Sequence, residues 1–461
     1  MGQLLDAVAA APGSGRAILD AATREVVGYA PVHDTAHLDA AIAAARAAQP
    51  DWDALGDDAR RDLLRRIADD IEASAPELGA LITREQGKPD GAGEVHGAAM
   101  WTRSAAETQI GPEVLADDGE HRSEIHYEPL GVVASIGPWN FPVMIAVWHI
   151  APALRMGNTV VVKPSEHTPL SVLALVEVFN RHLPAGVLTA ISGDREVGAR
   201  LAAHPDVDKI IFTGSTATGR RIVESSAHNL ARLTLELGGN DAGIVLPDVD
   251  VPAIASKLFW GAFMNTGQVC AALKRLYVHD DVYDVVVDAL ASIAAGTPIG
   301  SEGEGRRLGP VQNPDQFSIV SRLVDDARSR GARIVTGGEP APELGPLFYR
   351  PTIVADIEDG AQLVDEEQFG PVLPVIRYTD VDDAIRRANA SSQGLGASVW
   401  SSDVAAAAAV AGRLQAGTVW INAHGGLNPQ VPFGGRKASG YGVEFGIEGL
   451  KAVAAQKVVN F

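Results

Sequence analysis

The sequence has few cysteines and a deficit of positive charge, and each shortage excludes a class of protein. Cys270 is the only cysteine in 461 residues, which excludes an intramolecular disulfide and a cysteine-rich metal cluster and fits a reducing compartment. Lysine and arginine total 38 against 58 aspartate and glutamate residues, giving a formal net charge of -20. Nucleic acids and anionic membranes need clustered basic side chains, so we expect neither as a partner.

Targeting and metal-binding signals are also missing. The N-terminal stretch MGQLLDAVAAAPGSGR has no cationic region and carries Asp6 in its apolar part, so we expect no secretory signal and a cytoplasmic location. There is no H-E-x-x-H motif. His33 and His37 are four residues apart but lack a third ligand, so we predict no metal site.

One apolar segment is long enough to cross a bilayer. From Pro129 to Leu154 the only ionisable residue is His149. Pro138 and Pro142 would break a membrane helix near its middle. The segment therefore predicts a buried strand, an irregular turn and a buried helix.

The length of the chain exceeds what one hydrophobic core usually supports, so we expect two domains. The first 110 residues indicate helices, including Ala36–Gln49, ended by Pro50, and a second helix with the stripe Leu63, Leu64, Ile67 and Ile71. Beyond Pro129, β-branched runs alternate with helix-sized segments, which predicts an α/β protein with parallel sheets. The expected strands are Val132–Ile136, Thr159–Val162, Val187–Ile191, Lys209–Phe212 and Leu233–Leu237, then Ile244–Leu246, Leu276–Val278, Ala332–Val335, Val372–Val375, Ala397–Trp400 and Thr418–Ile421.

The C-terminal stretch Lys451–Phe461 is β-prone and lies beyond the expected core. We expect it to pair with an edge strand, on this chain or on another subunit.

The solitary thiol follows a turn that contains a glycine, Asn265–Val269. A lone cysteine is more often a small buried hydrophobe than a reactive group. The alternative is a nucleophile, which needs a lowered pKa, a base and an oxyanion donor. Candidates for the last two lie elsewhere in the chain.

An isolated carboxylate, Glu236, ends a strand-like run between two leucines and precedes Gly238 and Gly239. Apolar neighbours would raise its pKa toward the working pH, which suits a general base. A strand-end glutamate that caps a neighbouring backbone is the alternative. The two glycines would let a nicotinamide ring or a backbone approach closely.

Asn140 stands between Pro138 and Pro142 in apolar surroundings. A buried amide must find partners, and an amide N–H could face a developing alkoxide. An asparagine that only stabilises the turn is the alternative.

Two further segments suit a dinucleotide. Lys163 and Glu166 follow the strand Thr159–Val162, at the sheet edge where ligands of open α/β sheets bind, and the glutamate would repel a 2′-phosphate. An exposed ion pair is the alternative. The turn Phe212–Gly219 could hold a pyrophosphate on the backbone N–H groups of a helix start, or it could be an ordinary capped turn. Arg220 replaces the lysine of a kinase-type P-loop, and no G-x-G-x-x-G occurs.

Together these five segments resemble the aldehyde dehydrogenase superfamily in order and approximate spacing, from about residue 17 to the end. Further matching segments are Glu366–Pro371, Ala416–Asn422, and Pro432–Lys437 with Ser439 and Gly440. The resemblance implies an α/β fold with a Rossmann-like cofactor domain, an α/β catalytic domain and a small β oligomerisation arm. The resemblance places the cofactor domain at 1–110 and 130–237, the catalytic domain at 238–438, and the arm at 111–129 and 439–461. It also implies a homodimer or homotetramer.

The same resemblance assigns roles to the motif residues. It makes Cys270 the nucleophile, Asn140 an oxyanion donor together with the Cys270 backbone N–H, and Glu236 the base for hydrolysis of the thioester. The cofactor is expected to be NAD rather than NADP. The expected cofactor-binding residues are Ile136, Trp139, Lys163, Ser165, Glu166, Gly214, Ser215, Gly219, Leu237, Gly238, Glu367 and Phe369.

The expected substrate pocket is apolar. Apolar residues beside the thiol favour an apolar or aromatic aldehyde. The pocket residues are Phe141, Ile145, Trp148, Val269, Ala271 and Phe433. The sequence departs from many relatives at Leu273 and Lys274, which are larger than usual, and at Gln86 in the turn Glu85–Pro89.

The expected function is oxidation of an aldehyde to a carboxylic acid with reduction of NAD, through a thiohemiacetal and a thioester on Cys270. One alternative is a coenzyme A-acylating semialdehyde dehydrogenase, in which a thiol accepts the acyl group and Glu236 would be unnecessary. The other is an inert scaffold, against which the joint presence of Cys270, Asn140 and Glu236 argues, because burying unpaired polar groups is costly.

Overall fold

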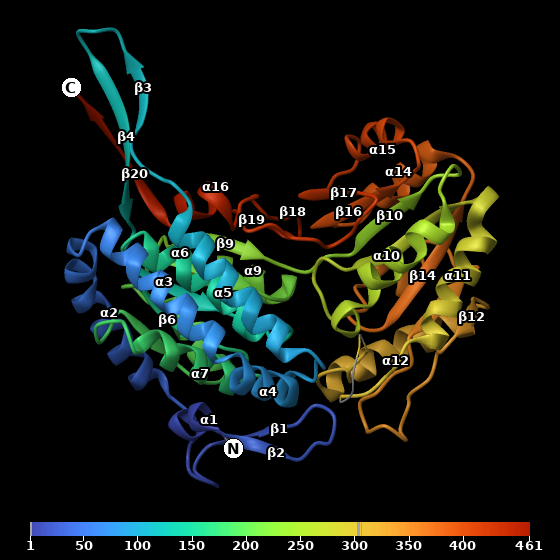
Figure 1. The fold of residues 1–461 in the computed structure, drawn as a ribbon, viewed down its shortest axis with the longest axis horizontal. Coiled ribbons are helices and arrows are strands. Elements are labelled where there is room, and N and C mark those ends of the chain that lie inside the picture. The colour runs from blue at the N-terminus through green and yellow to red at the C-terminus, as the bar shows by residue number, and fades with distance from the viewer. Residues whose placement is uncertain (1, 302–304, 306) are drawn as a thin grey trace.

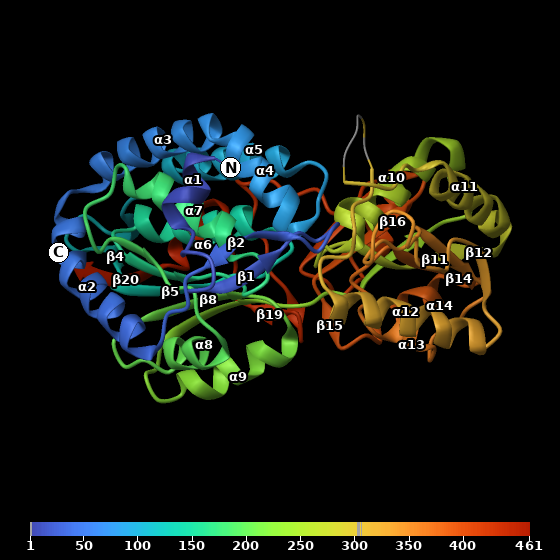
Figure 2. The same cartoon turned by 90° about the horizontal axis from the view of Figure 1, so that it is seen from below.

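The computed structural model of the protein describes residues 2–461 apart from 302–304 and 306. Two α/β lobes lie side by side, and a β arm projects from the first of them (Figures 1 and 2). The chain enters through α1 (Gln3–Val8) and the hairpin of β1 (Arg16–Leu19) and β2 (Val26–Ala30).

The first lobe is built on a six-stranded sheet of order β19-β9-β8-β5-β6-β7. Five of its strands, β9, β8, β5, β6 and β7, are mutually parallel and confirm the first set of predicted strands. The short strand β19 pairs antiparallel with β9 at one edge. Three of these strands are buried along their whole length, or nearly so, which explains their continuous apolar runs. The bounds are β5 (Val132–Ile136), β6 (Thr159–Lys163), β7 (Leu188–Ala190), β8 (Lys209–Thr213), β9 (Arg232–Glu236) and β19 (Gly440–Tyr441).

Helices cover this sheet, and one of them differs from its prediction. Helix α2 (Thr35–Ala54) continues through Pro50, where we expected it to end. Proline removes one helical hydrogen bond. The last turn is nevertheless fixed because Trp52 is buried and its indole N–H donates to the carbonyl of Leu154 at 3.0 Å. The other helices are α3 (Asp57–Ala73), α4 (Ala75–Gln86), α5 (Gly91–Glu107), α6 (Pro142–Arg155), α7 (Pro169–Asn180), α8 (Arg195–Ala202) and α9 (Thr216–Ser226).

The apolar segment from Pro129 forms strand β5, a turn and helix α6, which confirms the predicted strand, turn and helix. Leu64, Ile67 and Ile71 of the predicted stripe are buried on α3. Among the described helices, none combines the length and the apolar character required to cross a membrane.

The second lobe is built on a seven-stranded sheet of order β12-β13-β14-β11-β10-β16-β17. The pairing is parallel except between β12 and β13. The second set of predicted strands is confirmed, whereas β13 was not predicted. The strands are β10 (Asp241–Val245), β11 (Leu273–His279), β12 (Arg333–Thr336), β13 (Thr352–Ala355), β14 (Val372–Tyr378), β16 (Gly396–Trp400) and β17 (Thr418–Ile421); the helices are α10 (Val251–Phe263), α11 (Tyr283–Gly296), α12 (Pro314–Ser329), α13 (Gln362–Asp365), α14 (Val381–Asn389) and α15 (Val404–Ala411).

The arm is a three-stranded antiparallel sheet made of β3 (Glu113–Asp117), β4 (Arg122–Pro129) and β20 (Ala454–Asn460). It stands away from the body with the C-terminus on it (Figure 1). The C-terminal stretch pairs with β4 of its own chain.

Residues 439–461, which we assigned to the arm, are divided between two places. Strand β19 belongs to the first lobe's sheet, because Gly440, with φ of 112°, brings its backbone against Leu235 where a Cβ would collide. Helix α16 (Gly446–Lys451) then leads into β20.

Candidate active site

The two lobes enclose a cavity of about 200 Å³ at the carboxyl ends of first-lobe strands. Strand β5 lies between β6 and β8, so the strand order reverses beside it, and such a switch point is where open α/β sheets bind ligands. The second lobe closes the cavity with the loop that carries Cys270, here called the thiol loop, and with the segment after α13 that contains Glu367 and Phe369. The lining residues are Pro138, Trp139, Asn140, Thr213, Gly214, Ser215, Glu236, Leu237, Gly238, Cys270, Gln316, Glu367 and Phe369.

Cys270 sits on a tight loop between α10 and β11. Asn265, Thr266 and Gly267 have φ values of 49°, 59° and 73°, so three successive residues adopt the left-handed conformation. Gly267 is required there, since a Cβ would collide with the backbone of Gly370. The loop thus turns sharply enough to present the thiol to the cavity.

The buried amine of Lys274 holds this loop. Its Nζ donates to the carbonyl of Gly267 at 3.0 Å and to that of Val269 at 2.9 Å. A second clamp comes from Gln268, whose side-chain N–H groups donate to the carbonyls of Asn265 (3.1 Å) and Pro310 (3.3 Å). Lys274 was noted in the sequence only as an unusual residue, and no local pattern shows that its amine reaches back over the turn.

Asn140 is buried against the same loop. Its side-chain N–H donates to the carbonyl of Gln268 at 3.0 Å, two residues before the thiol. The backbone carbonyl of Asn140 accepts hydrogen bonds from Asn265 Nδ2 at 3.0 Å and from Lys88 Nζ at 2.8 Å. The backbone of Asn140 is therefore held by Lys88 of the first lobe and by Asn265 of the thiol loop in the second lobe.

The pKa of the thiol is not lowered, although a nucleophilic cysteine needs a lowered pKa. Burial, followed by the charges of Glu367, Glu236 and Asp241, raises the pKa of Cys270 to about 12. Lys274 acts in the opposite direction but does not offset them. This raised pKa favours the neutral thiol over the thiolate.

Glu236 is the last residue of β9 and is buried, as its apolar neighbours predicted. Neither carboxyl oxygen has a hydrogen-bond partner of good geometry among the described residues. Burial, together with the charge of Glu444, raises the pKa of Glu236 well above its usual value, and the backbone N–H of Gly435 only weakly opposes this. A carboxyl group with a raised pKa binds a proton more strongly once it is ionised, which suits a general base.

Glu444 was missed from the sequence. It is buried, and its Oε1 lies 3.3 Å from Nε2 of the fully buried His149 on α6. That ring also contacts the hydroxyls of Ser135 (2.9 Å) and Thr213 (3.0 Å). The available signal was an isolated carboxylate between Val443 and Phe445, the same kind of pattern that drew attention to Glu236.

Seven of the expected cofactor residues line the cavity. Glu367 is half-buried beside the cavity, and the loss of water around its carboxyl group raises its pKa to about 7. Its Oε1 accepts the backbone N–H of Gly239 at 3.3 Å, and a Cβ on Gly238 would collide with it. The seven residues are Trp139, Gly214, Ser215, Leu237, Gly238, Glu367 and Phe369.

The turn after β8 is a capped helix start. The Ser215 hydroxyl accepts the backbone N–H of Thr218 at 3.3 Å and is the N-cap of α9, which confirms the capped-turn interpretation. Gly219 allows close packing, because a Cβ there would lie 2.6 Å from the Leu237 side chain. The first turn of α9 still presents its N-terminus beside the cavity, where an anion is favoured.

Ile136, Lys163, Ser165, Glu166 and Gly219 do not line the cavity itself. Lys163 ends β6 and is buried, and burial lowers its pKa, while Glu166 is exposed. The amine of Lys163 donates to the carbonyl of Pro164 at 3.2 Å.

The described residues include no group of three or more side chains that could hold a metal ion.

The opposite side of the thiol is an aromatic cluster. Five of the six expected pocket residues pack in it with Cys270, whereas Val269 is buried outside it. Trp101 and Phe445, which the sequence did not single out, also belong to the cluster. Their ring centroids are 5.6 Å apart, and those of Trp148 and Phe445 are 4.8 Å apart. The five expected members are Phe141, Ile145, Trp148, Ala271 and Phe433.

An open α/β sheet with a ligand cavity at its switch point, a thiol, an amide and a buried carboxyl group define an oxidoreductase-like site. A sequence profile described as "Aldehyde dehydrogenase family" matches residues 9–459. Aldehyde dehydrogenase LUC3 of Fusarium sp is 41% identical over 96% of this chain and 94% of its own. Phenylacetaldehyde dehydrogenase of Pseudomonas fluorescens is 39% identical over 94% of this chain and 90% of its own.

Solved structures agree. An NAD+ complex of aldehyde dehydrogenase from Bacillus cereus superposes with a TM-score of 0.93 at 36% identity, covering 96% of this chain and 92% of that one. An Escherichia coli structure titled as an NADP dependent enzyme gives 0.94 at 35% identity, covering 96% and 94%. The chain belongs to the aldehyde dehydrogenase family, and it is an oxidoreductase that oxidises aldehydes to acids with a nicotinamide cofactor, NAD or NADP.

The residues present fit such a cofactor. Gly238 leaves open the space beside Glu367, the ring of Phe369 lies 5.3 Å from that of Trp139, and the N-terminus of α9 offers backbone N–H groups for a phosphate. When bound, the oxidised nicotinamide supplies a hydride acceptor and positive charge next to the thiol.

Proposed function

We propose that this aldehyde dehydrogenase uses Cys270 as its nucleophile, Asn140 as an oxyanion donor and Glu236 as the base that activates water, with NAD as the oxidant. The observation that carries the proposal is the convergence of these side chains, from three separate segments, on one cavity between the lobes. The thiol releases its proton to solvent, the sulfur bonds to the carbonyl carbon, and the C=O π electrons move onto the oxygen, which becomes negative. The Asn140 amide and the Cys270 backbone N–H stabilise that oxygen.

Bound NAD would supply the acceptor for the hydride of that carbon, and loss of the hydride would leave a thioester on Cys270. Glu236 then takes a proton from water, the resulting hydroxide attacks the thioester carbon, and the C–S bond breaks. The acid leaves, and the thiol is restored by a proton. The raised pKa of Glu236 supports this role, because a more basic carboxylate takes a proton from water more readily.

The preference for NAD rests on Glu166. It is exposed just after β6, next to the buried Lys163, at the edge of the sheet where the adenosine ribose is expected. A carboxylate there accepts hydrogen bonds from ribose hydroxyls and repels a 2′-phosphate.

The aromatic cluster beside the thiol supports an apolar or aromatic aldehyde. Its rings offer a large apolar surface, and aromatic pairs favour tilted or edge contacts with a further ring. The similarity to a phenylacetaldehyde dehydrogenase agrees with this substrate class.

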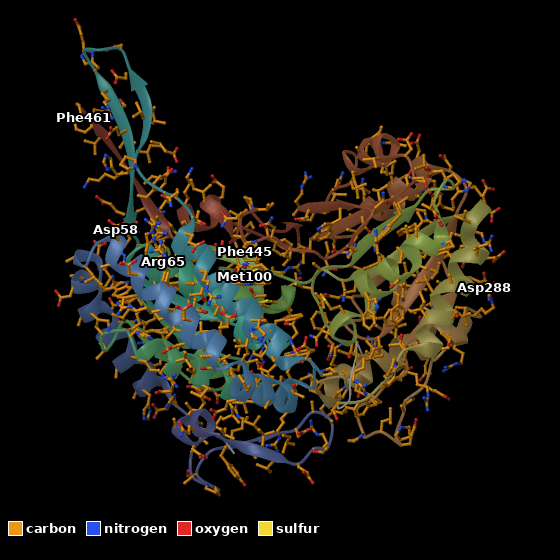
Figure 3. All side chains as sticks on the ribbon, in the orientation of Figure 1. Asp58, Arg65, Met100, Asp288, Phe445 and Phe461 are labelled. Atoms are coloured by element: carbon orange, nitrogen blue, oxygen red, sulfur yellow. The ribbon has the colours of Figure 1, made fainter. Side chains whose placement is uncertain are left out.

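The arm supports a homodimer or homotetramer. Each of its outer strands, β3 and β20, has one edge that pairs with no other strand of the described residues. Four apolar residues on the arm are each more than half exposed: Val114, Leu115, Val458 and Phe461. Figure 3 shows Phe461 on the arm. Such apolar strand edges are normally covered by another chain. Light scattering on the purified protein measures the subunit number.

The decisive experiment follows NADH formation with a panel of apolar and aromatic aldehydes, with and without coenzyme A. We expect NADH and free acid without coenzyme A. NADH that appears only when coenzyme A is added would establish the acyl-transfer reaction instead. No NADH with any aldehyde, while NAD binds, would establish an inert scaffold.

A further inference from the structure

Two buried glutamates near the turn Glu85–Pro89 cap two different helices of the first lobe. Glu94, on α5, accepts the backbone N–H groups of Val143 (2.8 Å) and Met144 (3.1 Å) at the start of α6. Glu85, on α4, accepts those of Leu170 (3.0 Å) and Ser171 (2.9 Å) at the start of α7. Neither helix has a side-chain cap from its own N-cap residue, so these distant carboxylates take that place.

Lys88 lies in the same turn and is buried, although the proposed chemistry gives it no role. Gly87, with φ of 96°, and the Gln86 side-chain oxygen, which accepts the Lys88 backbone N–H at 2.9 Å, shape the turn. The amine forms an ion pair with Glu94 and lies 3.6 Å from the centre of the Phe141 ring. A buried ammonium group is costly without such partners, so its position is tightly fixed.

The same amine reaches the oxyanion donor. Lys88 Nζ donates to the backbone carbonyl of Asn140 at 2.8 Å. Glu94 thus contacts both this amine and the first turn of α6, which begins two residues after Asn140. The backbone that carries the amide is held on one side by Lys88 and on the other by the capped helix.

We propose that Lys88 and Glu94 are positioning residues that aim the Asn140 amide at the oxyanion formed on Cys270. This inference rests on the proposed function. Among the described residues, Lys88 hydrogen-bonds to the backbone of Asn140 and Glu94 to the first turn of α6, and neither side chain hydrogen-bonds directly to the loop that carries the thiol. Asn265 of that loop shares the Asn140 carbonyl with Lys88. We therefore expect the pair to act mainly on the stabilisation of the negative oxygen and only slightly on the reactivity of the sulfur.

The test compares two reactions of the same thiol. Acylation by aldehyde, followed as the single-turnover NADH burst at saturating NAD, passes through an oxyanion. Alkylation by iodoacetamide does not. For Lys88→Met and Glu94→Gln we expect the burst rate to fall by about tenfold or more, since small misplacements of a catalytic group are costly, while the alkylation rate stays within about twofold of the parent.

The matched control is Glu85→Gln, which alters an equally buried carboxylate that caps a neighbouring helix. Among the described residues, the Glu85 side chain hydrogen-bonds to Leu170 and Ser171 and to neither Lys88 nor Asn140. We expect its ratio of burst to alkylation rate to match the parent. If the control lowers the ratio as much as Glu94→Gln does, or if both reactions slow together in the test variants, the pair is only a structural support and the inference is wrong.

A double mutant gives a second, independent measurement. In an Asn140→Ala background the amide is gone, so adding Lys88→Met should slow the burst no further. A full additional loss would overturn the inference. Failure of the proposed function looks different, because the parent enzyme itself would then show no burst.

Discussion

Glu236 and Glu444 are two buried carboxyl groups that influence each other, and neither has a hydrogen-bond partner of good geometry among the described residues. Burying like charges together is unfavourable, so the pair is best accommodated when a proton is retained. This relationship links the proposed base to a residue on a distant segment of the chain and makes its titration adjustable by substitution.

Replacing Glu444 by Gln should shift the pH dependence of thioester hydrolysis to lower pH. The charge of Glu444 contributes to the raised pKa of Glu236, so removing it lowers that pKa. Because Glu236 acts as a base only after losing its proton, the rising limb of the deacylation rate then begins at lower pH. The rate is measured as steady-state turnover against pH where hydrolysis is limiting. Glu448→Gln, an exposed change on α16, is the control. A limb that stays in place or moves upward would contradict this account.

The parallel sheets could be predicted because their strands are buried runs of β-branched residues, as in Val132–Ile136 and Lys209–Phe212. Cys270, Asn140 and Glu236 could be selected because each stands out from its immediate neighbours. Lys88 and Lys274 could not be given roles in this way. Their amines act on backbone carbonyls through the tertiary fold, and a lysine's neighbours in the sequence do not show where its amine ends.

Two other differences between the structure and what local sequence patterns suggest also arise from tertiary contacts. Helix α2 passes through Pro50 because a tertiary hydrogen bond fixes Trp52, which local helix rules do not include. A nucleophilic thiol needs a lowered pKa, but burial and three carboxyl groups raise the pKa of Cys270. Both outcomes depend on residues far away in the chain.

Replacing Lys274 by Met should impair both reactions of the thiol. Its amine holds the carbonyls of Gly267 and Val269, and its charge opposes the rise in the pKa of Cys270. We expect the NADH burst to slow by about tenfold or more, and iodoacetamide alkylation to slow as well, because less thiolate forms. This pattern contrasts with that of Lys88→Met. Lys257→Met, an exposed change on α10, should alter neither rate. Unchanged alkylation in Lys274→Met would remove Lys274 from the control of the thiol.

Replacing Glu166 by Ser should narrow the preference for NAD over NADP. Loss of the carboxylate removes both its hydrogen bonds to the ribose and its repulsion of a 2′-phosphate. We expect the ratio of kcat/KM for NAD to that for NADP to fall by about tenfold, equivalent to roughly 1.4 kcal/mol. Glu177→Ser, at an exposed position of α7, serves as the matched charge change. An unaltered ratio would place the ribose elsewhere.

The central claim is that Cys270 carries the acyl group, and intact-protein and peptide mass spectrometry of Glu236→Gln tests it most directly. Incubated with NAD and an aromatic aldehyde, this variant should release about one NADH per active subunit and then stop, with the mass of the acyl group on the peptide that contains Cys270. Cys270→Ser should show neither the burst nor the adduct. An adduct on another residue, or aldehyde oxidation by Cys270→Ser at the parent rate, would contradict the account.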